Sequence, residues 1–117
     1  MQPDDRVRIQ HMIEACDDAV QFSAGRARKD LDNDRMLLFA ILRAIEIVGE
    51  AASRVSKATQ HDAPEVPWTR IAGMRNRLVH AYFNVNLNLV WKSVTRDIPT
   101  LLPQLQALID QKPPEET

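Results

Sequence analysis

Residues 33–58 read NDRMLLFAILRAIEIVGEAASRVSKA and form the most apolar stretch of a chain of 117 residues. The charged positions within the stretch recur every three or four residues along a single stripe, which is the period of an α-helix. Everything around the stripe can be buried, while the stripe itself either is solvated or faces a site. The sequence therefore predicts a long helix over residues 33–58, with Asp32 or Asn33 as its N-cap. The stripe consists of Arg43, Glu46, Glu50, Arg54 and Lys57.

Apolar residues recur at helical spacing on both sides of this helix, and no segment alternates as a strand with hairpin turn signals would. Gly49 lies among apolar residues and predicts the close approach of another helix. Pro99 either starts a last helix or kinks the one before it. The further helices are expected over residues 4–23, from Pro67 or Trp68 through residues 74–83, over residues 86–97, and after Pro99.

The sum is an antiparallel all-α bundle of four to five helices. Residues 1–111 are expected to form a single domain, followed by a disordered tail at residues 112–117. The segment that begins at Gly25 has no apolar period and concentrates Arg26, Arg28 and Lys29, so an exposed basic loop is expected there.

Composition limits the class of protein. The formal net charge of -1 and the pI of about 6.3 argue against a general polyanion binder, so any nucleic-acid contact must be local. Cys16 is the single cysteine, which excludes an intrachain disulfide and a multi-cysteine metal cluster and favours a small buried residue. The apolar run from Met36 to Leu42 is too short to span a bilayer, and the N-terminus lacks the features of a signal peptide. A cytoplasmic protein without membrane contact is expected.

Residues 74–83 read MRNRLVHAYF and combine Arg75, His80 and Tyr82 within eight positions. Arginine is a permanent bidentate clamp for phosphate, and histidine gains and loses a proton near neutral pH. On an unbroken helix Arg75 would lie in the apolar stripe and would need a partner, for which Glu46 and Glu50 are candidates.

On the same unbroken helix His80 would point about 140° away from Arg75, so one copy of the motif converges poorly on one atom. Two copies related by a two-fold axis would bring both arginines and both histidines into a shared groove. Helical geometry therefore favours a site built by a dimer.

Each residue of this segment also has a structural interpretation. An arginine and a histidine on a helix often form an ion pair and a partly buried side chain, and an isolated Tyr82 is typical of the edge of a core. Asn76 is a candidate for orienting a phosphate or His80. Arg77 adds a cation that either contacts phosphate or is plain surface charge.

The pattern Arg75-x-x-x-x-His80-x-Tyr82 resembles the signature of HEPN-domain proteins, most closely the HepT toxins paired with MntA-type minimal nucleotidyltransferases. The resemblance covers nearly the whole chain. It extends to the segment from Ala44 to Ala52 and to Pro67-Trp68 before the motif. It also includes Val90-Trp91 and Asp97-Ile98-Pro99.

The resemblance implies a helical homodimer in which Arg75 and His80 form a metal-independent endoribonuclease with no cofactor. It further implies the toxin of a type VII toxin-antitoxin pair that cleaves RNA, with tRNA as one candidate. A cognate MntA-like nucleotidyltransferase would neutralise the toxin by attaching AMP to Tyr82. The alternative is a non-catalytic helical subunit that binds a nucleotidyltransferase or presents substrate to it, with Arg75 and His80 holding the dimer interface.

Overall fold

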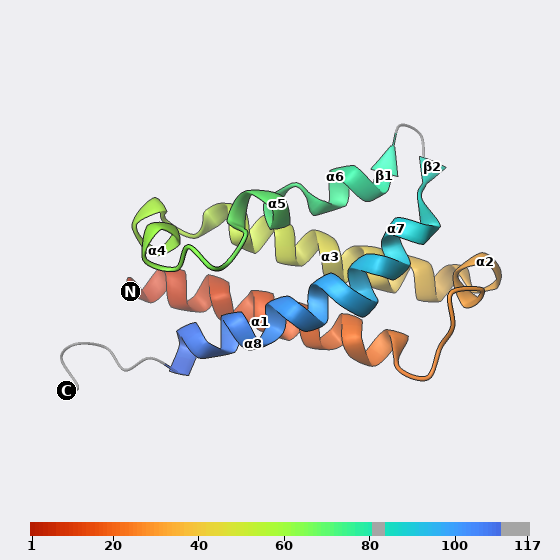
Figure 1. Ribbon diagram of the computed structural model, residues 1–117, viewed down its shortest axis with the longest axis horizontal. Coiled ribbons are helices and arrows are strands. Elements are labelled where there is room, and N and C mark those ends of the chain that lie inside the picture. The colour runs from red at the N-terminus through yellow and green to blue at the C-terminus, as the bar shows by residue number, and fades with distance from the viewer. Residues whose placement is uncertain (81–83, 111–117) are drawn as a thin grey trace.

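The computed structural model describes residues 1–80 and 84–110, and at His80 it describes the backbone. Tyr82 and the expected tail at residues 112–117 lie outside the described residues. The described part is a helical bundle in which two long helices form the base and two further segments cover them (Figure 1).

The base of the bundle consists of α1 (Pro3–Ser23) and α3 (Arg35–Arg54), which pack along each other. Pro3 occupies the first helical position of α1, where its missing N–H removes no hydrogen bond. The N-cap of α3 is Asp34, whose side chain accepts a hydrogen bond from the Leu37 amide at 3.0 Å. The expected cap, Asp32 or Asn33, is wrong because both residues belong to a short separate helix, α2 (Asp30–Asn33).

The long helix ends earlier than residue 58, because Val55 adopts an extended conformation. Ser56 then caps α4 (Lys57–Asp62), its hydroxyl accepting from the Thr59 amide. The buried carboxylate of Asp5 ties this junction to α1: it accepts from the Ser56 amide at 2.8 Å, the Ser56 hydroxyl at 2.6 Å and the Thr59 hydroxyl at 2.7 Å. A single carboxylate thus joins two helix starts that are far apart in sequence.

The expected continuous helix from residue 67 through the motif is wrong. The chain instead forms α5 (Trp68–Ala72), α6 (Met74–Leu78) and then the strand β1 (Val79–His80). Gly73 interrupts the helix with φ -94° and ψ 2°, and the β-branched Val79 leaves helical geometry with φ -117° and ψ 113°. β1 pairs antiparallel with β2 (Asn84–Val85), and His80 lies opposite Asn84 in this two-stranded ladder.

After β2, Asn86 caps α7 (Leu87–Lys92) by accepting from the Leu89 amide. The chain continues through a π-helical turn, η1 (Ser93–Asp97), into α8 (Ile98–Asp110) without leaving the helical path. Pro99 lies in the first turn of α8, consistent with the expectation that it starts the last helix. The π turn lies directly before the position where Pro99 can donate no backbone hydrogen bond.

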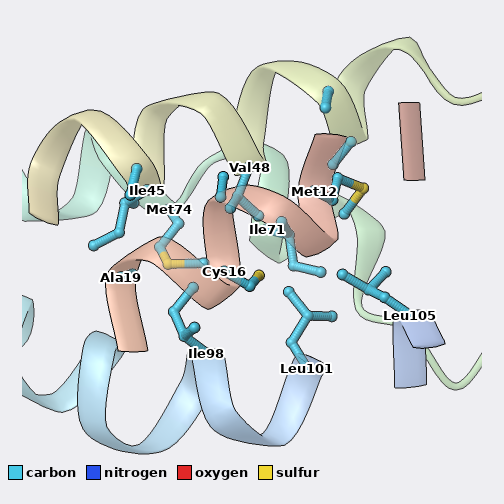
Figure 2. Close-up of a cluster of buried hydrophobic side chains, with 14 of the residues drawn as sticks. Met12, Cys16, Ala19, Ile45, Val48, Ile71, Met74, Ile98, Leu101 and Leu105 are labelled. Carbon is cyan, nitrogen blue, oxygen red and sulfur yellow. The ribbon is translucent and has the colours of Figure 1, made fainter. Parts of the chain in front are cut away.

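The core lies where α1, α3, the α5–α6 segment and α8 meet, and Figure 2 shows side chains from all four pointing into it. Cys16 is fully buried in this core, as expected, and burial raises the pKa of its thiol to about 12. At Gly49 a Cβ atom would lie 3.1 Å from the Ile71 carbonyl oxygen and 3.3 Å from that of Ala72. The glycine therefore permits the close approach of α3 and α5 that the sequence predicts.

The expected all-α bundle is confirmed, apart from the two strands of two residues each. The helices within residues 1–80 and 84–110 include none with the length and apolarity that crossing a bilayer requires. The fold places the motif segment on top of α3, with the motif running over into the β1–β2 ladder at one end of the bundle (Figure 1).

Candidate active site

A groove of about 770 Å³ lies beside Arg75, between α3, α6 and the β1–β2 ladder. We call it the Arg75 groove. Its wall on α3 combines apolar and charged side chains, whereas its opposite wall includes Val79 and Asn84 from the two strands. Arg75 and Glu46 also line a second hollow of about 300 Å³ farther along α3, together with Glu50 and Asn76. The α3 wall of the groove includes Arg35, Leu38, Phe39, Leu42, Arg43 and Glu46.

Arg75 is exposed, so the expectation that it lies in the apolar stripe is wrong. Its side chain is 47% accessible, whereas the neighbouring Met74 is 4% accessible and takes the buried position. The interruption at Gly73 shifts the phase of α6 relative to α5, which turns Met74 inward and Arg75 outward. Arg75 is therefore open to a ligand from solvent.

Of the two predicted partners of Arg75, Glu46 lies near it at a long distance, while Glu50 lines the smaller hollow without a salt bridge to Arg75 among the described residues. Nε of Arg75 lies 3.8 Å from one carboxylate oxygen of Glu46, while Nη1 of Arg43 donates to the other oxygen at 2.6 Å. An exposed pair at 3.8 Å contributes little free energy, whereas arginine binds phosphate through short charge-assisted hydrogen bonds. A phosphate group entering the groove can therefore displace Glu46 from Arg75.

The position of His80, the second candidate catalytic residue, is known from its backbone. His80 lies in β1, so the expected angle of 140° from Arg75, which assumed an unbroken helix, does not apply. Its ladder partner, Asn84, lines the Arg75 groove. Tyr82 lies outside the described residues and is the second residue after β1 in the sequence.

The two other candidate residues lie on different flanks of α6. Asn76 lines the smaller hollow together with Arg75, so the structure brings these two residues together. Arg77 lines a separate hollow toward α8, with Arg70 and Arg96. The structure therefore separates Arg77 from Arg75.

The expected basic loop is largely neutralised by acidic neighbours. Arg26 pairs with Asp30 at 3.4 Å and with Asp34 at 2.8 Å, and Arg28 pairs with Asp32 at 3.0 Å. The hydrogen bond from Arg26 holds the pKa of Asp34 below its ordinary value. These arginines are engaged within their own segment and add little free positive charge to the Arg75 groove.

Two exposed apolar residues of α3 were not predicted from the sequence: Phe39, which lines the groove, and Met36, which precedes it by three residues. Met36 is 84% accessible and Phe39 is 50% accessible, with the guanidinium of Arg35 lying 5.3 Å from the centre of the Phe39 ring. The signal was available, because extending the charged stripe from Arg43 backward by four and then three residues reaches Phe39 and Met36. The exposed face of α3 thus turns from charged to apolar near its N-terminus.

Across the part of the chain that the structure describes, no three His, Cys, Asp or Glu side chains gather in an arrangement that could hold a metal ion. Arg75 lines both hollows and Asn76 lines the smaller one, and a guanidinium group and a side-chain amide both suit an anion such as phosphate.

Comparison with known proteins gives the chain a family. A protein of Caldanaerobacter subterraneus subsp. tengcongensis named "Putative RNase TTE0752" is 32% identical over 107 residues, which cover 92% of this chain and 96% of that protein. A protein of Thermococcus cleftensis named "Probable ribonuclease HepT" is 35% identical over 100 residues, covering 86% of this chain and 91% of that protein. No solved structure matches the chain. Residues 12–108 match the family described as "Ribonuclease HepT-like", and the chain therefore belongs to the HepT-like family.

Proposed function

We propose that this protein is a metal-independent endoribonuclease, the toxin of a type VII toxin-antitoxin pair, with Arg75 and His80 as its catalytic residues. Membership of the HepT-like family and relatives named as RNases support an RNA-cleaving activity. The enzyme would act in the cytoplasm on RNA, with tRNA as one candidate.

The proposed reaction needs a base and a cation. His80 removes the proton of a ribose 2′-hydroxyl, and the resulting oxyanion attacks the adjacent phosphorus. Arg75 stabilises the negative charge that gathers on the phosphoryl oxygens. The P–O5′ bond breaks, the 5′-oxygen takes a proton, and the products are a 2′,3′-cyclic phosphate and a 5′-hydroxyl.

The observation that carries the proposal is the state of Arg75. A structural ion pair would bury this guanidinium against a carboxylate, whereas the side chain is 47% accessible and lies 3.8 Å from its acidic neighbour. An arginine held ready at the edge of a groove suits the binding of a phosphate that arrives with the substrate.

We propose further that the enzyme works as a homodimer joined through the apolar part of the α3 face. Met36 and Phe39 expose large apolar side chains, and Leu38, Leu42 and Leu87 line the adjoining Arg75 groove. Exposed apolar patches of this kind mark interaction surfaces. A two-fold axis at this face would place two copies of Arg75 beside one shared cleft.

The proposed control of the toxin acts on Tyr82. A cognate MntA-like nucleotidyltransferase would catalyse attack of the tyrosine hydroxyl on the α-phosphate of ATP, with release of pyrophosphate and transfer of the hydroxyl proton to solvent. Tyr82 lies two residues beyond His80, so the attached AMP would place bulk and negative charge near the site where RNA phosphate binds. Modification would thus both block and repel the substrate.

The test of the ribonuclease proposal is cleavage of RNA in EDTA by the purified chain. Arg75→Ala and His80→Ala should each lower the rate by at least about 100-fold, the scale of a lost catalytic acid-base or oxyanion-stabilising group. Arg54→Ala, which removes an exposed arginine outside the Arg75 groove, should leave the rate unchanged. Equal rates for all four proteins, or no cleavage by any of them, would contradict the proposal and favour the non-catalytic subunit.

The AMP proposal has a separate test. Incubation with an MntA-like nucleotidyltransferase and ATP should add adenylyl groups that mass spectrometry places on Tyr82, with loss of ribonuclease activity. Tyr82→Phe should remain unmodified at that position and active. Inactivation of Tyr82→Phe to the same extent as the unmodified sequence would contradict this role.

A further inference from the structure

Three arginines from different parts of the chain meet around a hollow of about 250 Å³ on the far flank of α6 from Arg75. Arg70 comes from α5, Arg77 from α6, and Arg96 from the π turn η1. We call this hollow the Arg77 pocket. It lies between the motif segment and the η1–α8 segment, which cross the upper and front parts of Figure 1.

The pocket has an apolar floor and a cationic rim. Ile71, Met74 and Leu101 form the floor and are 2%, 4% and 3% accessible. The arginines of the rim are exposed. The Gln104 side-chain amide donates to the Glu65 carbonyl oxygen at 3.3 Å and ties α8 to the loop that closes one end. The guanidinium groups of the rim suit a phosphate, which they can bind through charge-assisted hydrogen bonds.

Among the described residues, the three arginines of the rim form no salt bridge with a carboxylate. This holds although Glu65 and Asp97 line the same pocket. Arg26, Arg28 and Arg43 behave differently, because each pairs with a nearby carboxylate at 2.6–3.4 Å. The three guanidinium groups outnumber the two carboxylates that line the pocket, and without such pairing they are available to an anion.

The π turn adds an independent observation. Arg96 and Asp97 both belong to η1, and isolated π turns occur frequently at functional sites. The Thr100 hydroxyl donates to the Arg96 carbonyl oxygen at 2.8 Å and stabilises the turn. The π turn thus contains Arg96, one of the three arginines of the rim.

We infer that the Arg77 pocket binds a backbone phosphate of the RNA substrate, separate from the phosphodiester held at Arg75. This inference rests on the proposed ribonuclease function. It adds a second contact between the protein and the RNA backbone, beside the one at Arg75. Arg75 and Arg77 are two residues apart on α6, so their side chains project roughly 200° apart. A single RNA strand that crosses α6 would place one phosphate at each.

This second contact also explains how a chain with a net negative charge could bind RNA. A chain with a net charge of -1 needs a local concentration of cations to hold RNA, and the Arg26–Lys29 segment is largely neutralised. The Arg77 pocket supplies that concentration beside the proposed catalytic groove. Arg77 is thereby a phosphate-binding residue rather than plain surface charge.

The test is binding of a fluorescein-labelled single-stranded RNA in which every ribose carries a 2′-O-methyl group. Such a strand cannot be cleaved by 2′-hydroxyl attack, so binding is measured on the full chain independently of catalysis. Arg77→Gln and Arg96→Gln should each weaken binding roughly 3- to 10-fold and lower the slope of log affinity against log salt by about 0.7. Arg54→Gln, outside both sites, should leave both quantities unchanged.

Melting temperatures of the three variants control for folding and should agree with the wild type within about 2 °C, since all three arginines are exposed. The inference would be overturned if Arg77→Gln and Arg96→Gln left the affinity for the RNA strand unchanged. It would also be overturned if the wild type did not bind the strand. An oligoglutamate peptide that binds with the same arginine dependence while the RNA does not would assign the pocket to an acidic protein partner and overturn the RNA assignment.

The outcomes separate this inference from the proposed function. If cleavage depends on Arg75 and His80 but strand binding does not depend on Arg77 and Arg96, the ribonuclease proposal is supported. The assignment of the Arg77 pocket to RNA is then contradicted. If strand binding depends on Arg77 and Arg96 but no RNA is cleaved in EDTA, the assignment of the Arg77 pocket to RNA phosphate is supported. The ribonuclease proposal is then contradicted.

Discussion

Arg75 and Glu46 face each other between α6 and α3, with Nε of the arginine 3.8 Å from a carboxylate oxygen of the glutamate. The other oxygen of Glu46 is held by Arg43 at 2.6 Å, so the carboxylate remains anchored on α3 when Arg75 moves to another anion. The pair thus combines a carboxylate that Arg43 holds in place with a guanidinium cation that is available to a phosphate, and the function we propose depends on that availability.

The first prediction separates catalysis from stability at two neighbouring positions. Arg75→Ala should abolish RNA cleavage while changing the free energy of unfolding by less than about 0.5 kcal/mol, because the side chain is exposed. Met74→Ala should cost about 2–5 kcal/mol, because it empties a buried position. Urea unfolding curves of both variants check this, and a large loss of stability in Arg75→Ala would assign the arginine a structural role.

The second prediction concerns competition for Arg75. Glu46→Gln removes the negative charge that opposes an incoming phosphate, so RNA binding should tighten by roughly two- to fivefold, the scale of an exposed ion pair. The uncleavable 2′-O-methyl strand gives the affinity. Weaker binding or loss of cleavage comparable to Arg75→Ala would instead mean that Glu46 positions the arginine for catalysis.

The third prediction tests the dimer face. Phe39→Glu introduces a charge into the apolar part of the α3 face and should shift the protein from dimer to monomer in sedimentation experiments, with loss of cleavage. Val7→Glu is the matched control, because Val7 is 45% accessible on α1 and Phe39 is 50% accessible. An unchanged sedimentation coefficient for Phe39→Glu would exclude this face as the interface.

The fourth prediction follows from the Asp5 carboxylate. Burial raises its pKa, but hydrogen bonds from the Ser56 and Thr59 side chains and from the Ser56 amide outweigh burial and hold the pKa below its ordinary value. A pKa lowered in the folded state contributes stability above the unfolded pKa of about 3.9, and this contribution is lost as the pH falls through the folded value.

Asp5→Asn should therefore destabilise the protein by about 1–3 kcal/mol at pH 7, and the difference from the wild type should shrink toward pH 2. Asp4→Asn, at an exposed neighbour, is the control and should have little effect at either pH. Urea midpoints at pH 7, 4 and 2.5 measure this, and a constant difference across the three values would show that the ionisation of Asp5 does not matter.

The long elements and the core were predictable because their signals are local. The boundaries of α1 lie within one residue of expectation, and the apolar periodicity of α3 correctly marked the buried side of the bundle. Gly49 was correctly assigned to a close helix contact. The cap at Asp34 was missed because Asp32, Asn33 and Asp34 are all capping residues and stand in a row. The cap at Ser56 was missed because the long helix was expected to continue to residue 58, and the contact that Ser56 makes with Asp5 is tertiary.

The motif segment was the part that sequence reasoning misplaced. Gly73 and Val79 are weak local signals, and the strand at Val79 pairs with Val85, six residues farther along the chain. The error propagated, because a continuous helix puts Arg75 in the core and His80 on its flank. The dimer proposal therefore no longer rests on helical geometry. It rests on the exposed Met36 and Phe39 side chains and on the family resemblance.

The most direct test of the proposed reaction is the chemistry of the cleaved ends. RNA cut by the purified chain in EDTA should end in a 2′,3′-cyclic phosphate and begin with a 5′-hydroxyl, and a single 2′-O-methyl group at the cut nucleotide should abolish cleavage there. Cleavage that persists at the methylated nucleotide and leaves a 3′-hydroxyl and a 5′-phosphate would contradict attack by the 2′-hydroxyl and, with it, the roles of Arg75 and His80.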